Sequence, residues 1–295
     1  MKKLNLFSLF MMLFSAGVMA QSVPTHEMYV NSGTPTNIVE ALDKWEPGKP
    51  WNGDANYIDE NFWISRVPLK DRFRPGDQAN DALNDENNKK FCWMAPTGEM
   101  TKKWGALPRY NFDGDNFNMW QYLDIHSNWT NGFWRVPGAF NDVAHKNGVK
   151  TGCTYFIDWG TNIQINEEPG KTLYELSAPL SAANAYGDKY KYSRKLIQFL
   201  KYYGIDGLCF NPEGRWGVAL YQRFIPFLAE CHKIADELGW AFHVDWYAYV
   251  TNRGMLSDNG CKLTSENDNW FHNNEYDQPV TDVFFLNYNW TEAGL

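Results

Sequence analysis

The sequence is poor in the residues that build disulfide frameworks and metal sites. It holds five cysteines, an odd number with no C-x-x-C spacing, and six scattered histidines. An odd cysteine count without paired spacing argues against a disulfide scaffold and against a zinc site. We therefore expect neither a metal nor another cofactor.

The sequence also lacks a basic stripe and an apolar run long enough to cross a membrane. Its formal net charge is −8 at pH 7, so nucleic acid and anionic membranes are not expected partners. The apolar run Leu4–Val18 follows Lys2 and Lys3 and ends in small residues at Ala20. Residues 1–20 thus predict a secretory signal rather than a span, and an exported protein of bacterial type that is periplasmic, cell-surface or secreted.

Aromatic residues, by contrast, are abundant. They make up 17% of the chain, with 14 tryptophans and 16 tyrosines. Flat rings stack on the C–H faces of sugars, so this composition fits glycan binding, although most of the rings are expected to fill the core.

The order of predicted elements indicates an α/β fold. Residues 21–88 are polar and rich in Pro, Gly and Asn, which predicts an extended leader, and residues 89–295 form the predicted catalytic domain. Helices that close on Gly148, Gly204 and Gly239 run straight into apolar strands, as in repeated βα units. The expected strands are 91–95, 122–127, 149–159, 205–210, 241–250 and 283–286, and the expected helices are 137–146, 192–203 and 218–238. A (β/α)₈ TIM barrel fits best, apparently truncated after its sixth strand.

The stretch from Gly204 to Glu213 organises the predicted domain. Its apolar residues predict a buried parallel strand, and Asn211 and Glu213 follow at the carboxyl end. Two residues apart on an extended backbone, both side chains point the same way, toward the end of the barrel where active sites lie. The alternative is a solvated glutamate beside a turn-forming asparagine.

An amide next to a carboxylic acid suits one kind of glycoside cleavage. A sugar with a 2-acetamido group can attack its own anomeric carbon, so the enzyme needs no nucleophile. Glu213 would protonate the leaving oxygen if burial raises its pKa, and Asn211 would orient the acetamido group.

These residues also carry a family resemblance. The segment 204–213 resembles the active-site strand of glycoside hydrolase family 85, the endo-β-N-acetylglucosaminidases that cut the chitobiose core of N-linked glycans. Further stretches resemble family motifs in the same order: residues 120–125 resemble its second strand, 144–150 its "AHRNGVK", 154–159 its "GTFIxEW", 246–247 its "WYDS" and 285–290 its "FLNYxW". The resemblance implies a retaining endoglycosidase that forms an oxazoline intermediate, with an N-linked glycan or glycoprotein as substrate.

The resemblance and the barrel together supply the remaining site residues. Tyr247 is the third expected catalytic residue, because the family tyrosine reaches the acetamide or the intermediate. The strand ends supply the expected substrate-binding residues Asp158, Trp159, Trp246, Asn287 and Trp290. Alternatives remain for several: Tyr247 and Trp290 could be core rings, and Asp158 could cap a loop.

Two other functions stay open at the level of the sequence. "WYDS" becomes Trp246-Tyr247-Ala248-Tyr249 here, which leaves room for a non-catalytic glycan-binding barrel. A chitinase-like family 18 enzyme would use D-G-x-D-x-D-x-E, but Cys209 and Asn211 stand where that pattern requires Asp.

Overall fold

A computed structural model describes the central part of the chain in separate ranges. The described residues are 28–29, 37–46, 64–72, 92–95, 103–104, 118–128, 136, 138–157, 170–212, 216–247, 251–254, 264–271, 276 and 280–285. The predicted signal at 1–20 and most of the predicted leader lie outside them.

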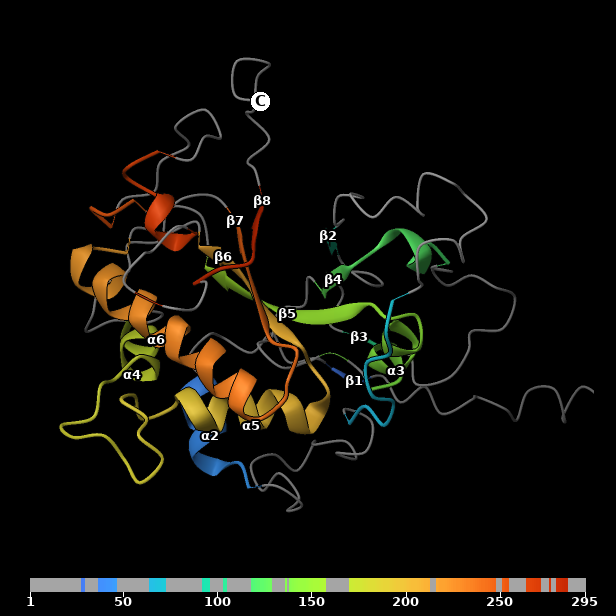
Figure 1. The fold of residues 1–295 in the computed structure, drawn as a ribbon, viewed down its shortest axis with the longest axis horizontal. Coiled ribbons are helices and arrows are strands. Elements are labelled where there is room, and N and C mark those ends of the chain that lie inside the picture. The colour runs from blue at the N-terminus through green and yellow to red at the C-terminus, as the bar shows by residue number, and fades with distance from the viewer. Residues whose placement is uncertain are drawn as a thin grey trace, which may run out of the picture.

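Six parallel strands form the main sheet (Figure 1). In sheet order they are β2 (Cys92–Ala95), β4 (Ile125–Asn128), β5 (Lys150–Ile157), β6 (Gly207–Pro212), β7 (His243–Tyr247) and β8 (Val283–Phe285). Every neighbouring pair is parallel and consecutive along the chain, as in a (β/α)₈ barrel. A small antiparallel pair, β1 (Met28–Tyr29) with β3 (Lys103–Trp104), stands apart.

The sheet curls into a nearly closed barrel, as shown by side-chain contacts between strands that are not neighbours in the sheet. The Ser127 hydroxyl of β4 donates to the Asp245 carboxylate of β7, across the two strands that separate them in the sheet. Cys92 Sγ of β2 lies 3.9 Å from Asp245 Oδ2. Flat sheets keep such strands far apart, because neighbouring strands are about 4.8 Å from each other. The predicted barrel architecture is therefore confirmed.

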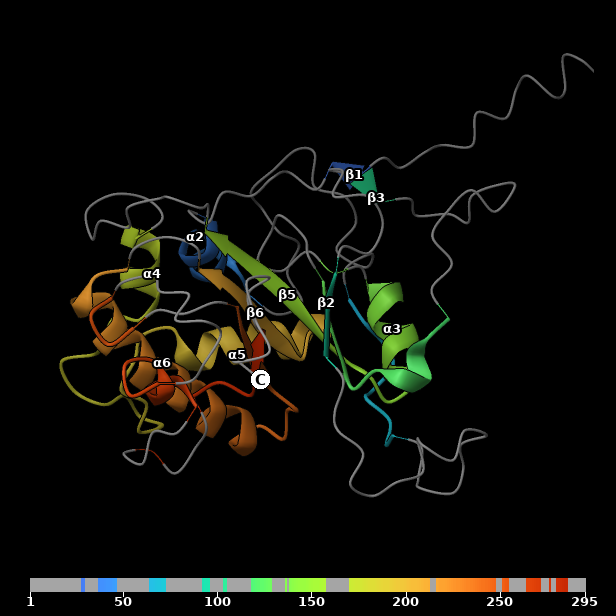
Figure 2. The same cartoon turned by 90° about the horizontal axis from the view of Figure 1, so that it is seen from above.

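Helices cover the outside of the barrel. They are α2 (Asn37–Lys44), α3 (Gly138–Lys146), α4 (Gly170–Leu176), α5 (Ser193–Tyr203) and α6 (Val218–Glu237), with 3₁₀ turns η4 (Trp120–Tyr122) and η6 (Asp268–Trp270). Figures 1 and 2 show α2, α4, α5 and α6 gathered near β6, with α3 beside β4 and β5.

The local sequence explains why α5 packs on the barrel and ends just before β6. Leu196, Phe199 and Leu200 are fully buried on one side of the helix, the spacing of an amphipathic helix. The helix ends at Gly204, which has φ +75° and whose N–H reaches the Leu200 and Lys201 carbonyls. A left-handed residue at this position favours glycine, and a Cβ there would approach Ser65 Cβ to 2.3 Å.

The leader differs from its prediction in one respect. Residues 37–44 are helical rather than extended, and Ile38 and Leu42 are buried in the main core with Trp45 after them. Trp45 packs against Phe199 at 5.2 Å between ring centroids. Burying these side chains stabilises the helix, which has little support from its own short length.

One further feature of the fold concerns membranes. Within the described ranges, no helix combines the length and the apolar character that crossing a bilayer requires.

Candidate active site

The strands of the barrel present two chemically different faces. Leu208 and Phe210 of β6 and Val244 and Trp246 of β7 belong to the hydrophobic core under the helices. Residues alternate along a strand, so Cys209, Asn211, Asp245 and Tyr247 face the opposite way, into the barrel. The strand register pairs Cys209 with Asp245, which places Asn211 and Tyr247 at the same level, one step nearer the carboxyl ends.

A polar layer fills the interior below Asn211 and Tyr247. Asp245 is fully buried and accepts from Ser127, and its Oδ1 lies 3.0 Å from His243 Nδ1. His243 Nε2 lies 3.2 Å from the Thr151 carbonyl. Glycine is required here, because a Cβ at Gly207 would come within 2.5 Å of the His243 ring. This layer seals the barrel beneath the predicted site.

The Asp245 charge sets the protonation of its neighbours. Burial lowers the pKa of His243, but the charge and hydrogen bond of Asp245 outweigh burial, so that the pKa is raised overall. Burial first and Asp245 second raise the pKa of the Cys92 thiol, and the same two causes raise that of Cys209. Both cysteines are therefore neutral thiols in the barrel, not nucleophiles.

Asn211 occupies the position that the sequence predicts for it. Its side chain is fully buried at the carboxyl end of β6. Neither its amide nitrogen nor its carbonyl oxygen has a hydrogen-bond partner among the described residues. A buried polar atom without a partner costs about 1–3 kcal/mol, so this carboxamide is an exception that calls for a partner.

Tyr247 and Trp246 are neighbours with different surroundings. Tyr247 faces the interior beside Asn211 and is 7% exposed. Trp246 is 0% exposed and stacks on Trp270 with 4.0 Å between centroids, with Phe210 and Trp216 also in contact. This position puts the Trp246 ring among core rings on the helix side of the strand, and its contact with the substrate stays a prediction.

The other predicted site residues lie outside the described residues. They are Glu213, Asp158, Trp159, Asn287 and Trp290. The described part of β6 ends at Pro212, just before Glu213, and that of β5 ends at Ile157, just before Asp158 and Trp159. The described part of β8 ends at Phe285, before Asn287 and Trp290. Their roles stay predictions.

Sequence reasoning missed the polar layer itself. Asp245, His243, Ser127 and Cys92 come from β7, β4 and β2, and no spacing in the sequence joins them. One signal was present: His243-Val244-Asp245-Trp246-Tyr247 alternates polar and apolar up to its last residue, which is the pattern of a strand with one polar face.

A second buried pair anchors the opposite end of β6. Asp206 Oδ2 accepts the Thr151 N–H at 2.7 Å and lies 2.9 Å from His145 Nε2. His145 Nδ1 lies 2.6 Å from the Val67 carbonyl. Burial lowers the pKa of His145, but Asp206 more than compensates and the pKa is raised. His145 is thus structural, as its position at a helix end predicts.

Known proteins resemble this chain over most of its length. A "Cytosolic endo-beta-N-acetylglucosaminidase" of Danio rerio is 28% identical over 61% of this chain, and one of Gallus gallus is 27% identical over 92%. The chain spans only 22% and 33% of the length of these two relatives. The crystal structure of the glycoside hydrolase domain of Endo-D from Streptococcus pneumoniae R6 superposes with a TM-score of 0.66 at 24% identity, covering 87% of this chain and 37% of that one. This likeness supports the barrel fold.

The curated relatives overturn the prediction of export. Those from Danio rerio and Gallus gallus, and two more from Arabidopsis thaliana, are all named as cytosolic. The apolar run at residues 4–18 was therefore a misleading guide to location, because composition alone does not distinguish a signal from other apolar segments. The bacterial origin stays a prediction.

The family assignment depends on a match independent of these relatives. The profile of glycosyl hydrolase family 85 matches residues 99–295, which include every strand from β3 to β8 and all the predicted site residues. The family 18 interpretation loses its basis, since its acidic strand pattern is absent. The chain belongs to glycosyl hydrolase family 85.

Proposed function

We propose that this protein is an endo-β-N-acetylglucosaminidase that cleaves the GlcNAc-β-1,4-GlcNAc core of N-linked glycans, the activity of a mannosyl-glycoprotein endo-β-N-acetylglucosaminidase. The observation that carries the proposal is Asn211, whose buried carboxamide has two polar atoms without partners among the described residues. An acetamido group offers one donor and one acceptor, which is the complement that this side chain lacks.

The proposed reaction uses the acetamido group of the substrate as nucleophile. Its carbonyl oxygen bonds to the anomeric carbon while the bond from that carbon to the leaving oxygen breaks, and Glu213 gives its proton to the leaving oxygen. The product of this step is an oxazolinium ion, the protonated form of the oxazoline, which keeps the N–H of the acetamido group. Water then attacks the anomeric carbon, the Glu213 carboxylate takes a proton from the water, and the ring opens with the original configuration retained.

Asn211 and Tyr247 support this reaction from the barrel interior. The Asn211 amide holds the acetamido group in the conformation that attacks, which lowers the entropic part of the barrier. Tyr247 shares its face and level, which supports a role for its hydroxyl against the acetamide or the intermediate. The polar layer around Asp245 stays below them and keeps the floor rigid.

The decisive experiment is glycan release from a high-mannose glycoprotein, measured by mass spectrometry of the freed oligosaccharide. We expect release by the unaltered protein and a loss of about 10²–10⁴-fold in Glu213→Gln, the usual contribution of a general acid. Glu175→Gln on α4 is the matched control, because Glu175 is exposed on a helix outside the barrel, and it should keep full activity.

Two results would count against the proposal. Full activity in Glu213→Gln would remove the general acid from the scheme. Binding of the glycoprotein without any turnover by the unaltered protein would favour the non-catalytic glycan-binding barrel, which the altered "WYDS" motif keeps as the second candidate.

A further inference from the structure

A large groove lies on the outer surface of the barrel. Its volume is about 1060 Å³, and α6 contributes one side, residues 187–190 a second and the segments that follow β7 a third. None of its lining residues belongs to a strand, and none is a predicted catalytic residue.

Tyrosines give the groove its flat surfaces. Tyr190, Tyr221 and Tyr276 all line it. Burial, then Tyr276 and Glu230, raises the pKa of Tyr190 to about 12, which places these groups close together. The Tyr190 ring is fixed edge-on against Phe227 at 5.7 Å. Tyr190 and Tyr276 are partly exposed, and tyrosine rings suit the C–H surfaces of sugars.

One of these tyrosines has an unmet hydrogen-bonding group. Tyr221 is 4% exposed, and its hydroxyl makes no hydrogen bond of normal geometry to a described residue. Burial raises its pKa, and the nearby Asn269 amide opposes that shift. Both residues line the groove. The Tyr221 ring therefore forms part of the groove's buried floor, next to Asn269.

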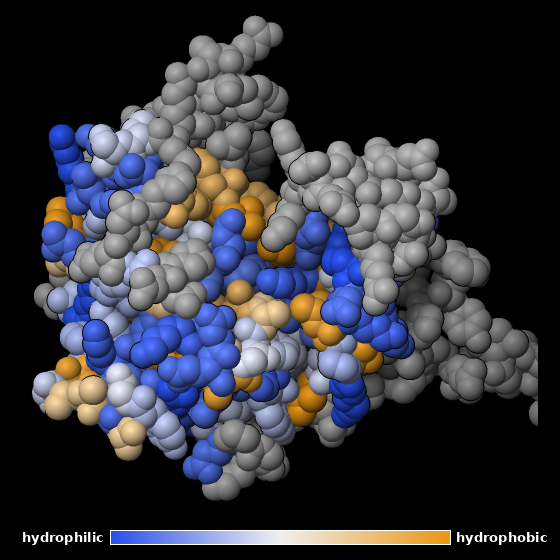
Figure 3. All heavy atoms as spheres, viewed as in Figure 1, coloured by the Kyte–Doolittle hydropathy of each residue, from blue (hydrophilic) through white to orange (hydrophobic). Residues whose placement is uncertain are grey.

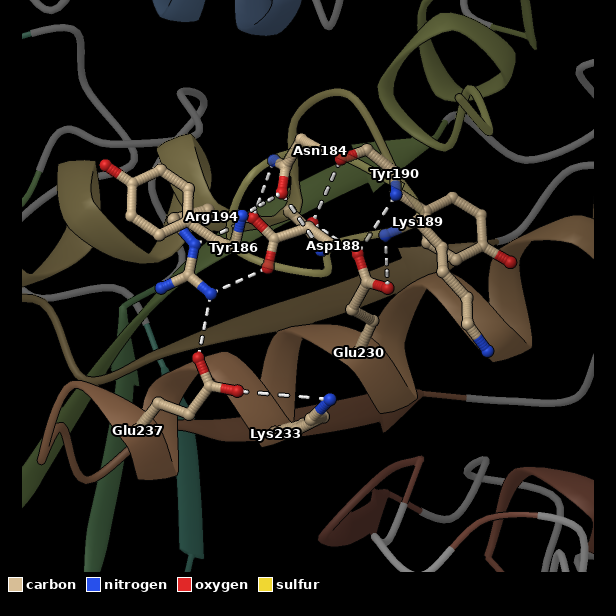
Figure 4. A network of polar contacts seen from close by, with 10 residues as sticks. Asn184, Tyr186, Asp188, Lys189, Tyr190, Arg194, Glu230, Lys233 and Glu237 are labelled. Atoms are coloured by element: carbon tan, nitrogen blue, oxygen red, sulfur yellow. Dashed lines mark hydrogen bonds and ion pairs between the residues drawn. The ribbon is translucent and has the colours of Figure 1, made fainter. Parts of the chain in front are cut away.

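The wall formed by residues 187–190 is rigid before any ligand arrives. Glu230 accepts the N–H groups of Lys189 and Tyr190 at 2.8 and 3.0 Å and the Ser193 hydroxyl at 2.7 Å. Figure 4 shows the neighbouring network, in which Arg194 binds Asp188 through two hydrogen bonds of 2.6 and 2.7 Å. A preformed wall lowers the ordering cost of binding.

The remaining polar groups of the groove suit a ligand with many hydroxyl groups. Both oxygens of Glu230 are already engaged. Gln222 and Asn252 present exposed amides that donate and accept. Lys189 and Lys233 add exposed ammonium donors. The large exposed apolar residues, Met119, Tyr122, Val143, Tyr186 and Val218, all lie outside the lining, which disfavours an apolar protein partner. Figure 3 shows hydrophilic residues interspersed with smaller hydrophobic patches on the face viewed in Figure 1.

We propose that this groove is an accessory binding site for an oligosaccharide of several sugar units. Its volume lies just above the range for small-molecule sites, about 300–1,000 Å³, which suits linked sugars better than a single one. The site does not depend on the chemistry proposed for the strand ends. It would hold a carbohydrate chain against the outside of the barrel.

The test is an NMR titration of the isotope-labelled protein with mannopentaose, cellopentaose and maltopentaose. None of these probes has the N-acetyl group that the proposed catalysis needs. We expect at least one to shift the amide signals of residues 187–190 and 222–233. The double variant Gln222→Ala/Asn252→Ala should weaken that binding about fivefold or more, as expected for a few lost hydrogen bonds.

Two matched comparisons sharpen the test. Tyr276→Phe should bind like the unaltered protein, whereas Tyr276→Ala should lose about tenfold in affinity, because stacking needs the ring and not the hydroxyl. Gln198→Ala on α5 removes an exposed amide outside the groove and should change nothing. The exposed Gln222 and Asn252 keep the test valid if Tyr276→Ala fails to fold.

Three results would overturn the proposal. The first is no shift with any of the three probes. The second is binding that Asn211→Ala abolishes and the Gln222→Ala/Asn252→Ala variant leaves intact, which would assign the sugar to the strand ends. The third is concentration-dependent self-association in sedimentation that the double variant abolishes, which would make the groove a contact between copies of the chain.

Discussion

The buried pair beneath β6 offers a quantitative test of how this barrel holds its site in place. Replacing Asp206 with Ala removes the acceptor of the Thr151 N–H and the partner of His145 Nε2, at 2.7 and 2.9 Å. Both groups stay buried, and each then costs about 1–3 kcal/mol. Breaking a buried pair from one side costs about 3–5 kcal/mol in other proteins, so we expect a loss of that size in the free energy of unfolding.

The assay is urea unfolding followed by tryptophan fluorescence, with the slope m compared between variants. Asp43→Ala is the matched control. Its carboxylate is 53% exposed and accepts the Tyr192 hydroxyl at 3.0 Å, so its removal should cost less than about 1 kcal/mol.

The effect of Asp206→Ala on stability should also depend on pH in a definite direction. The pKa of His145 is raised in the folded protein, because Asp206 outweighs the lowering by burial. Protonated His145 therefore contributes stability that is fully present below its ordinary pKa of 6.5. That contribution is lost as the pH rises through the raised pKa of the folded protein. The stability gap between the unaltered protein and Asp206→Ala should therefore narrow as the pH rises above 6.5. A loss below about 1 kcal/mol with unchanged m, or a gap that widens with pH, would refute the reasoning.

Three further predictions concern residues of the barrel strands. Asn211→Ala should lower glycan release about 10²–10³-fold yet leave the urea midpoint unchanged or higher, because the amide has no partner among the described residues to lose; a large drop in stability would contradict this. Gly207→Ala should destabilise by at least about 1–3 kcal/mol in the same unfolding assay, since the new Cβ would lie 2.4 Å from the His243 carbonyl oxygen; a neutral effect would show that the polar layer is loose. Burial lowers the pKa of His126 to about 4. Neutral His126 therefore contributes up to about 3 kcal/mol to the free energy of unfolding above pH 6.5, and this contribution is lost as the pH falls toward 4. His126→Phe should reduce the loss of stability between pH 6.5 and pH 4 in urea unfolding, and an unchanged loss would assign the pH dependence to other groups.

The comparison of sequence with structure shows where each kind of reasoning works. The six predicted strands and three predicted helices all exist, with ends shifted by a few residues. They were predictable because glycine stops and apolar runs are local signals. Helices α2 and α4 were missed, because they are short and depend on burial of side chains such as Leu42 and Leu173 in the shared core.

The site divides in the same way. Asn211 was placed correctly at the buried end of β6, since its position follows from one strand. Trp246 and Tyr247 were both assigned to the substrate, but adjacent residues of a strand point to opposite faces. The structure turns Tyr247 inward and buries Trp246 between Trp216 and Trp270.

The sequence by itself determined the βα rhythm, the strand that carries Asn211 and the resemblance to an endoglycosidase family, because each is encoded within a short stretch of chain. Only the tertiary structure decided which strand faces become the interior, that Asp245 meets Ser127 and Cys92 there, and that a tyrosine-lined groove forms along α6. Those features depend on the curvature of the sheet and on contacts between residues more than 100 positions apart, and no local pattern specifies either.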